Sequence, residues 1–135
     1  MKDDRTPVSV LIVEDSTVVR RRIRNMLCEL EHIHSVSEAA NAPDAMHKVD
    51  DARPDFVILD VRLANGTSGL EVLRHIKEIS HPCTTIMLTN LAYGEVRQEC
   101  MSLGADHFFN KATEFERVVE VLSSARTHLM QAPAQ

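Results

Sequence analysis

Short apolar runs recur along the chain, and each is bounded by polar residues or turn formers. The run at 56–59 contains β-branched and aromatic residues, follows Pro54 and leads directly into Asp60. Runs of this length and composition predict strands that are buried on both faces. The run at 33–39 is more polar, which favours a position at the edge of a sheet. We expect five strands, at 8–13, 33–39, 56–60, 84–88 and 107–110.

The segments between these runs carry apolar residues at helical spacing. Ser16 can cap the first helix, while Asn41 and Pro43 suit the start of the second. Gly104 suits the C-terminal cap of the fourth helix. We expect helices at 17–30, 41–49, 69–79, 93–103 and 113–130.

Strands and helices therefore alternate through the whole chain. This alternation predicts an α/β fold, in which a doubly wound parallel sheet of five strands has helices on both faces and right-handed crossovers. The length of 135 residues suits one such domain, at 8–130. Residues 1–7 are expected to form a disordered extension. We expect residues 131–135 to form a short tail, too short to link a second domain.

Composition excludes several classes of protein. The formal net charge of −5 argues against direct nucleic-acid binding, which normally requires a basic surface. The cysteines at 28, 83 and 100 form no CxxC pair, and this favours buried thiols in a reducing compartment. The sequence contains neither a signal peptide nor a run of transmembrane length. We expect a cytoplasmic protein with no membrane contact.

Polar side chains follow four of the predicted strands. Glu14 and Asp15 follow the first, Asp60 the third, Thr89 the fourth and Lys111 the fifth. Each residue alone is also a common turn or helix-cap residue. However, the carboxyl ends of parallel strands meet at one edge of a sheet, where ligands of open α/β sheets bind. We therefore expect three carboxylates, a hydroxyl and an ammonium group to converge there.

Three carboxylates in one place repel one another, since one pair of unit charges at ~4 Å is worth about 4 kcal/mol at an effective dielectric of ~20. A divalent cation relieves this repulsion, and an all-oxygen site with room for water suits Mg²⁺. A carboxylate beside such a cation can act as a nucleophile toward phosphorus and form an aspartyl phosphate. Lys111 and Thr89 could then neutralise and hydrogen-bond the phosphoryl oxygens.

With this ordered set of residues, the chain resembles the response-regulator receiver domain, the CheY-like family, from residue 8 to the last helix. The resemblance implies the flavodoxin/CheY-like strand order 2-1-3-4-5. It also implies that Asp60 is the phosphoacceptor, and that Thr89 and Lys111 contact the phosphoryl group. Thr89 and Phe108 would form the conformational switch.

The resemblance also implies a metal site for Mg²⁺ or Mn²⁺ and no other cofactor. Asp15 and Asp60 would bind the metal directly, Glu14 would assist through water, and the backbone carbonyl of Arg62 would complete the protein ligands. The chain departs from the family pattern at Ala112, where the family usually has proline, and at the larger residue Asn90. The loop at 61–68 is one residue longer than the commonest form.

The resemblance implies a stand-alone regulator in two-component signalling. It would take phosphate from a sensor histidine kinase or a histidine phosphotransfer protein, and catalyse only its own phosphorylation and dephosphorylation. Its expected output is a contact with a downstream protein through the fourth helix, fifth strand and fifth helix, and phosphorylation could also produce a homodimer. Arginines 20, 21, 22 and 24 lie together on the first helix, where a solvated face is favoured over a docking surface for an acidic partner.

Three alternatives compete with this interpretation. A receiver-like adaptor that works without phosphate stays open because of Ala112 and Asn90. A phosphatase of the haloacid-dehalogenase type would carry its nucleophilic Asp after the first strand, whereas Asp60 follows the third. A nucleotide-binding domain would have a glycine-rich turn after the first strand, where Glu14, Asp15 and Ser16 stand instead.

Overall fold

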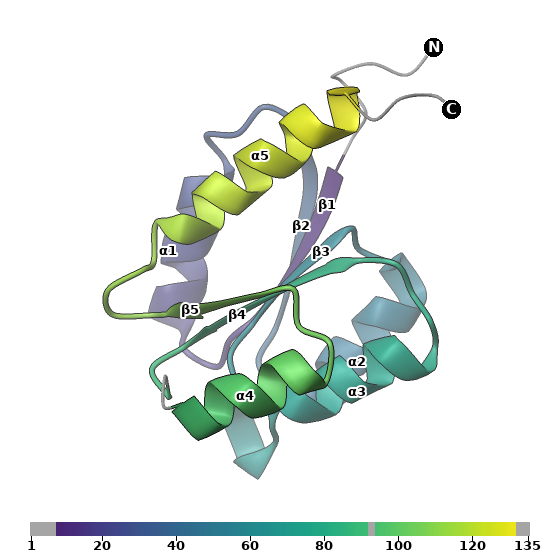
Figure 1. The fold of residues 1–135 in the computed structure, drawn as a ribbon, viewed down its shortest axis with the longest axis vertical. Coiled ribbons are helices and arrows are strands. Elements are labelled where there is room, and N and C mark those ends of the chain that lie inside the picture. Colours follow the sequence, from purple (N-terminus) through teal and green to yellow (C-terminus); the bar gives the residue numbers. More distant parts are fainter. Residues whose placement is uncertain (1–7, 92–93, 132–135) are drawn as a thin grey trace.

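The computed structural model describes residues 8–91 and 94–131, and it contains a five-stranded parallel sheet in the order β2-β1-β3-β4-β5 (Figure 1). This arrangement confirms the predicted fold class and strand order. The strands are β1 (Val8–Val13), β2 (Ile33–Ala39), β3 (Phe56–Leu59), β4 (Thr84–Thr89) and β5 (His107–Asn110). The helices are α1 (Thr17–Leu27), α2 (Ala42–Ala52), α3 (Gly69–Glu78), α4 (Gly94–Ser102) and α5 (Arg117–Gln131), with a short 3₁₀ turn η1 (Ala64–Gly66).

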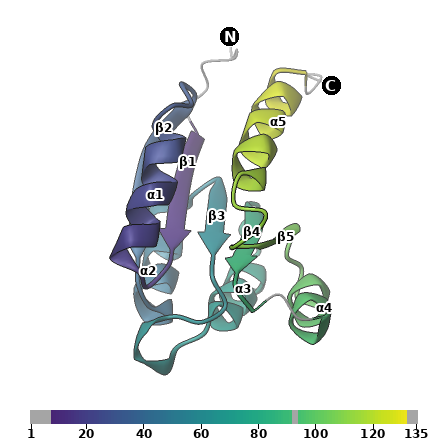
Figure 2. The ribbon, with the colours of Figure 1, turned by 90° about the vertical axis from the view of Figure 1, so that its left-hand side faces the viewer.

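The sheet separates two apolar layers, because successive side chains of a strand point to opposite faces. On one face, Ile12 and Ile58 pack among residues of α1 and α5, such as Ile23 and Leu122. On the other face, Val13 and its neighbours on the strands pack among residues of α2, α3 and α4. Figures 1 and 2 show α1 and α5 on one side of the sheet and the other three helices opposite them.

The helix starts confirm the expected caps. The Ser16 hydroxyl accepts a hydrogen bond from the Val19 amide at 3.2 Å, and the Asn41 side chain accepts one from the Asp44 amide at 2.8 Å. These side chains satisfy amide groups that have no partner within the first turn of a helix. Gly104 has a φ of +101°, and its left-handed conformation ends α4 as predicted.

The last helix begins later than predicted, at Arg117 instead of 113. The Asn110 side chain accepts hydrogen bonds from the amides of Ala112 and Thr113, at 2.8 and 3.2 Å. The Glu114 carboxylate in turn accepts one from the Asn110 amide at 2.8 Å. These side chains stabilise a turn in which the backbone amides have partners outside a helical ladder. Helical spacing alone did not reveal this competition.

Some predictions lie outside the described residues. These are the disordered extension at 1–7, the start of the fourth helix at Tyr93 and most of the tail at 131–135. Every peptide bond between described residues is trans, including the one between Lys111 and Ala112. Within the described parts of the chain, no helix has the length and apolar character needed to cross a membrane.

Candidate functional site

Three of the predicted strand-end residues meet at the carboxyl edge of the sheet. Lys111, just after β5, places its Nζ 2.7 Å from Oε1 of Glu14 and 2.5 Å from Oδ2 of Asp60. Glu14 directly follows β1 and Asp60 directly follows β3, so the order β1-β3-β4-β5 brings residues that lie 97 and 51 positions apart in sequence together. The convergence that we predicted at this edge is therefore present for these three residues.

Both carboxylates are buried and hydrogen-bonded. Glu14 is 3% exposed and Asp60 is 7% exposed. The second oxygen of Glu14 accepts a hydrogen bond from the Ser16 amide at 2.9 Å, and that of Asp60 accepts one from the Val61 amide at 2.7 Å. The amide of Asp60 donates to the carbonyl of Val13 at 3.0 Å, which aligns the ends of β1 and β3.

One ammonium group shared by two carboxylates leaves an excess of negative charge. Burial raises the pKa of Glu14, and the contacts with Lys111 and Ser16 offset this only in part. Burial opposes the charge of Lys111 as well, but its hydrogen bonds to Asp60 and Glu14 outweigh burial and raise its pKa. Lys111 therefore remains cationic, while Glu14 binds a proton more readily than an ordinary glutamate as the pH falls.

Thr89 is the last residue of β4, and its carbonyl oxygen accepts a hydrogen bond from the Lys111 amide at 2.9 Å, while Phe108 lies within β5. Thr89 is 1% exposed, and its hydroxyl oxygen accepts a hydrogen bond from the Leu91 amide at 3.1 Å. Phe108 is also buried, in the layer formed with α2, α3 and α4. Arg97 of α4 holds its guanidinium carbon 5.5 Å from the centre of the Phe108 ring and donates to the Phe108 carbonyl at 3.3 Å.

Asp15 and Arg62 lie apart from the buried cluster. Both side chains are exposed, and Asp15 makes no hydrogen bond or ion pair with the described residues. Arg62 forms an isolated backbone bridge with Ser68 across the loop that follows β3. Within 8–91 and 94–131, no three His, Cys, Asp or Glu side chains lie close enough together to hold a metal ion. The structure thus brings two carboxylates together where three were expected, and the metal-binding roles of Asp15 and Arg62 stay predictions.

The chemistry of the donor set fits a hard divalent cation. Glu14 and Asp60 present four buried carboxylate oxygens, each with one protein donor in the contacts above. A carboxylate has about four lone-pair positions, so each group retains acceptor capacity beyond these bonds. Oxygen ligands of this kind suit Mg²⁺ or Mn²⁺.

The sequence pattern did not predict the roles of two residues that support the site. A Cβ atom on Gly69, the first residue of α3, would lie 2.1 Å from the carbonyl oxygen of Asp60, so only glycine fits there. Arg20 of α1 donates through Nη1 to the carbonyl oxygen of Glu14 at 2.6 Å. A glycine at a predicted helix start was the available signal for Gly69, whereas Arg20 was one of four similar arginines and carried no signal of its own.

Comparisons with known proteins agree with this geometry. Residues 10–123 match the response regulator receiver domain. The chain is 30% identical over 118 residues to the chemotaxis protein CheY of Listeria monocytogenes, covering 87% of this chain and 98% of that protein. Among solved structures, the Vibrio cholerae chemotaxis protein CheY4 has a TM-score of 0.76 at 27% identity, covering 87% of this chain and 98% of that one.

Other relatives are longer proteins. The chain is 28% identical over 116 residues to protein-glutamate methylesterase/protein-glutamine glutaminase 1 of Methanospirillum hungatei, covering 84% of this chain. It spans only 34% of that protein. The match over 10–123 nevertheless includes every residue of the buried cluster. The chain therefore belongs to the response regulator receiver domain family, the phosphoacceptor domains of two-component signal transduction.

Proposed function

We propose that Asp60 is the residue that accepts the phosphoryl group. The observation that carries this proposal is the contact of a buried strand-end carboxylate with the Lys111 ammonium at 2.5 Å. In the transfer, an oxygen of Asp60 attacks the phosphorus of a phosphohistidine, the O–P bond forms, and the N–P bond breaks with its electron pair going to the imidazole. Lys111 then pairs with the phosphoryl oxygens, where its charge offsets the charge that develops on them.

Glu14, Asp15, Asp60 and the carbonyl of Arg62 would hold Mg²⁺ or Mn²⁺ at this edge of the sheet. When bound, the metal would draw charge from the phosphoryl oxygens. Receiver domains generally bind Mg²⁺ for phosphorylation, and the oxygen donors of Glu14 and Asp60 agree with this chemistry. Asp15 is exposed, so its carboxylate is accessible to a hydrated ion at the mouth of the site.

Thr89 and Phe108 would convert phosphorylation into a change of surface. The Thr89 hydroxyl oxygen already accepts the Leu91 amide, which leaves its proton available to a phosphoryl oxygen on Asp60. Movement of Thr89 toward the phosphate would open space beside β4 into which Phe108 could turn. Arg97 of α4 contacts both the ring and the carbonyl of Phe108, so movement of Phe108 would change the contacts of α4.

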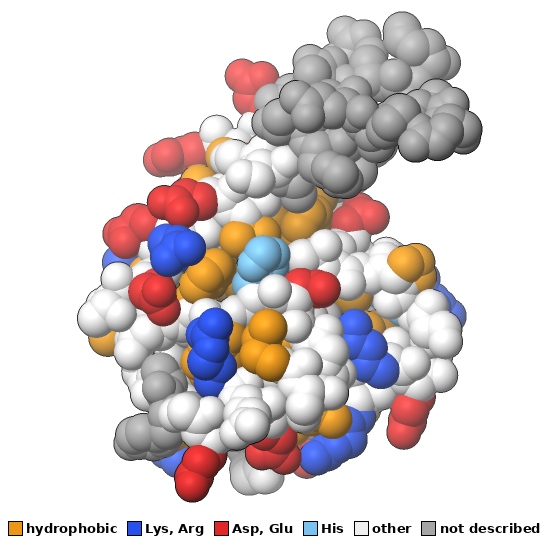
Figure 3. All heavy atoms as spheres, viewed as in Figure 1, with side chains coloured by type: hydrophobic (Ala, Val, Ile, Leu, Met, Phe, Trp, Pro, Cys, Tyr) orange, Lys and Arg blue, Asp and Glu red, His pale blue; other side chains and the backbone are white. Residues whose placement is uncertain are grey.

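The output would be a protein contact on the face made by α4, β5 and α5. Hydrophobic side chains gather over β5, between α4 and α5, with single basic side chains among them (Figure 3). Arg117 of α5 lies with its guanidinium carbon 5.1 Å from the centre of the Phe109 ring on the same strand. Aromatic and arginine side chains are enriched in protein interfaces. A downstream protein or a second copy of the chain could bind here, after phosphotransfer from a histidine kinase or histidine phosphotransfer protein in the cytoplasm.

The proposed acceptor predicts one phosphorylation site. Incubation with Mg²⁺ and acetyl phosphate should add one phosphoryl group, measured by intact mass, and Asp60→Asn should add none. Asp51→Asn is the matched control, because Asp51 is exposed near the end of α2 and outside the site. Uptake that persists in Asp60→Asn or in excess chelator would contradict the assignment. No uptake by the wild type from any donor would favour the adaptor that works without phosphate.

We expect the aspartyl phosphate at Asp60 to hydrolyse slowly. Hydrolysis needs a water in line with the breaking bond, and a polar side chain that orients this water accelerates it. The two residues that flank this approach in the family correspond to Arg62, which is exposed, and Leu91, which is half-buried. Leu91 is apolar, and a guanidinium cannot serve as a base. The double variant Arg62→Asn/Leu91→Glu should therefore lose phosphate faster than the wild type after donor removal in Mg²⁺. Slower loss in the double variant would refute this and indicate that Asn90 orients the water.

A further inference from the structure

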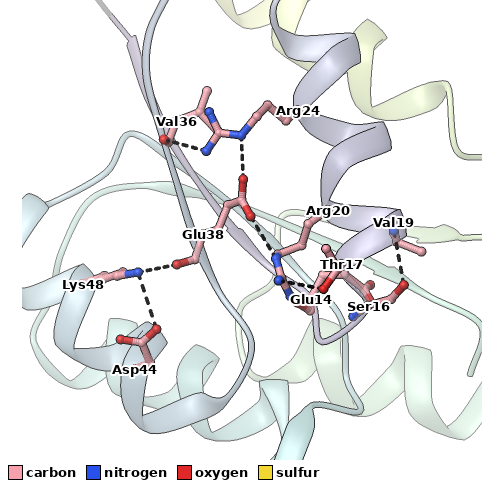
Figure 4. Close-up of polar contacts among 10 residues, drawn as sticks. All are labelled: Glu14, Ser16, Thr17, Val19, Arg20, Arg24, Val36, Glu38, Asp44 and Lys48. Carbon is pink, nitrogen blue, oxygen red and sulfur yellow. Dashed lines mark hydrogen bonds and ion pairs between the residues drawn. The ribbon is translucent and has the colours of Figure 1, made fainter.

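Each polar group of Glu14 has a hydrogen-bond partner. Its amide donates to the carbonyl of Ala39 at 3.0 Å, and its side chain contacts Ser16 and Lys111. The remaining group is its carbonyl oxygen, which accepts the bond from Nη1 of Arg20 at 2.6 Å (Figure 4). This carbonyl belongs to the peptide unit that joins Glu14 to Asp15, where the chain turns from β1 toward α1. The orientation of that unit therefore sets the direction of both acidic side chains.

Arg20 is itself fixed at three points. Besides Nη1, its Nε donates to Oε1 of Glu38 at 2.9 Å and its Nη2 donates to the Thr17 hydroxyl at 3.3 Å. The Arg20 side chain is only 17% exposed, so this is a partly buried contact and not a surface ion pair. Two of the four clustered arginines, Arg20 and Arg24, thus bind Glu38 instead of forming a wholly solvated face.

Glu38 lies on the edge strand β2 and is held from both sides of the sheet. Its second carboxylate oxygen accepts a bond from Nε of Arg24 at 2.6 Å, and its backbone carbonyl accepts one from Nζ of Lys48 on α2 (Figure 4). Lys48 is in turn 3.5 Å from Asp44. The carboxylate is therefore a fixed acceptor that orients the guanidinium of Arg20 toward Glu14.

We propose that Arg20 is a positioning residue for the phosphoryl-transfer site, and that Glu38 fixes it in place. Arg20 orients the peptide unit between Glu14 and Asp15, and through it the two acidic side chains that would receive Mg²⁺. This role rests on the proposed function of the site. Arg20 does not contact Asp60 or the phosphoryl group, so it acts only through Glu14.

Positioning and simple electrostatics predict opposite results. Removal of the Arg20 charge leaves Glu38 with one cationic partner fewer, and this makes the region more negative. On electrostatic grounds alone, Arg20→Ala would bind Mg²⁺ more tightly than the wild type. Loss of positioning weakens binding instead, because groups that orient the ligands of a metal typically contribute about tenfold or more to its affinity.

The experiment compares Arg20→Ala, Arg20→Lys and Arg24→Ala with the unphosphorylated wild type. Arg24 binds the same Glu38 carboxylate and the carbonyl of Val36 but does not touch Glu14, so it is the matched control. Mg²⁺ affinity is measured by amide chemical-shift titration. Hydrogen exchange of the Ser16 amide, which is bonded to Glu14, is measured without metal, with the amide of Thr85, bonded to Asp106 near the start of β4, as reference.

We expect Arg20→Ala to weaken Mg²⁺ binding about tenfold and to accelerate exchange at Ser16 but not at Thr85. Arg24→Ala should change neither quantity by more than about twofold. Arg20→Lys should lie between the wild type and Arg20→Ala, because one ammonium cannot bind Glu38 and the Glu14 carbonyl with the geometry of a guanidinium.

Three outcomes would overturn the proposal. Tighter Mg²⁺ binding by Arg20→Ala would mean that its charge alone matters. Equal effects of Arg20→Ala and Arg24→Ala would mean that both merely attach α1 to β2. Unchanged Ser16 exchange in Arg20→Ala and Arg20→Lys would mean that Glu14 needs no such support. If the wild type takes up no phosphate, the proposed function fails, whereas the Ser16 exchange still decides whether Arg20 positions Glu14.

Discussion

Gly69→Ala is expected to destabilise the protein severely and to displace the site. The new methyl carbon would lie 2.1 Å from the carbonyl oxygen of Asp60 and 3.0 Å from its carbonyl carbon. Because the contacting atoms belong to the backbone, no side-chain rotation relieves the clash. The chain must move either α3 or the end of β3, and the hydrogen bond from the Gly69 amide to the Val61 carbonyl at 2.7 Å would be strained or lost.

Overpacking of a core usually lowers the free energy of unfolding by about 1–3 kcal/mol, and we expect Gly69→Ala to lie at or above the upper end of this range. Chemical denaturation measures it, and the amide shifts of Asp60 and Val61 show whether the site has moved. Gly94→Ala is the matched control, since Gly94 also begins a helix but a Cβ there meets nothing within 4 Å. It should be neutral or stabilising by about 0.4–1 kcal/mol. Equal free energies of unfolding for the two variants would contradict the proposed close contact.

The meeting of Glu14, Asp60 and Lys111 could be predicted because it depends on topology alone. The alternation of strands and helices determined a parallel sheet, and a parallel sheet places the carboxyl ends of its strands along one edge. Glu14 and Asp60 directly follow well-defined apolar strands, and Lys111 directly follows the short strand His107–Asn110, so all three lie at that edge.

The separation of Asp15 from this cluster could not be predicted in the same way. Glu14 and Asp15 are adjacent and similar, yet Glu14 is 3% exposed and Asp15 is exposed. The direction of each side chain depends on the peptide unit between them, and the Arg20 bond to that unit is a contact of the folded chain. The pattern of apolar and polar residues predicts where a strand ends. It does not predict the backbone torsion angles of the residues that follow the strand.

The support of Arg20 by Glu38 illustrates the same limit. The two residues are 18 positions apart, and Glu38 lies on a strand whose polarity indicated only an edge position. Nothing in the spacing of four arginines distinguishes the two that contact Glu38 from Arg21 and Arg22. Arg22 instead lies with its guanidinium carbon 3.9 Å from the centre of the Phe115 ring. Such pairings follow from the packing of α1 on the sheet.

Lys111→Met is expected to have the other large effect on stability in the absence of metal. The change removes the ammonium that contacts Glu14 and Asp60, and it leaves these two buried carboxylates without it. Breaking a buried ion pair by removing one partner typically costs about 3–5 kcal/mol, and the partial exposure of Lys111 favours the lower end. Lys77→Met, at an exposed lysine of α3, should change stability by less than about 0.5 kcal/mol.

The stability lost in Lys111→Met should increase as the pH rises. Burial raises the pKa of Glu14 above its ordinary value of 4.5, and removal of Lys111 raises it further. A carboxyl group whose pKa is raised on folding favours the folded state below its unfolded pKa, and this advantage is lost as the pH rises through the folded pKa. The deficit of Lys111→Met should therefore be smallest near about pH 4.5 and should grow as the pH rises through the folded-state pKa of Glu14.

Denaturant titrations of the wild type and Lys111→Met at several pH values measure this difference. Glu14→Gln in the Lys111→Met background provides the decisive comparison, because the amide oxygen can still accept the Ser16 bond but the side chain carries no charge. The double variant should recover most of the lost stability at about pH 8 and lose most of the added pH dependence. If the double variant stays as unstable as Lys111→Met at every pH, the loss comes from packing of the lysine side chain and not from two uncompensated charges.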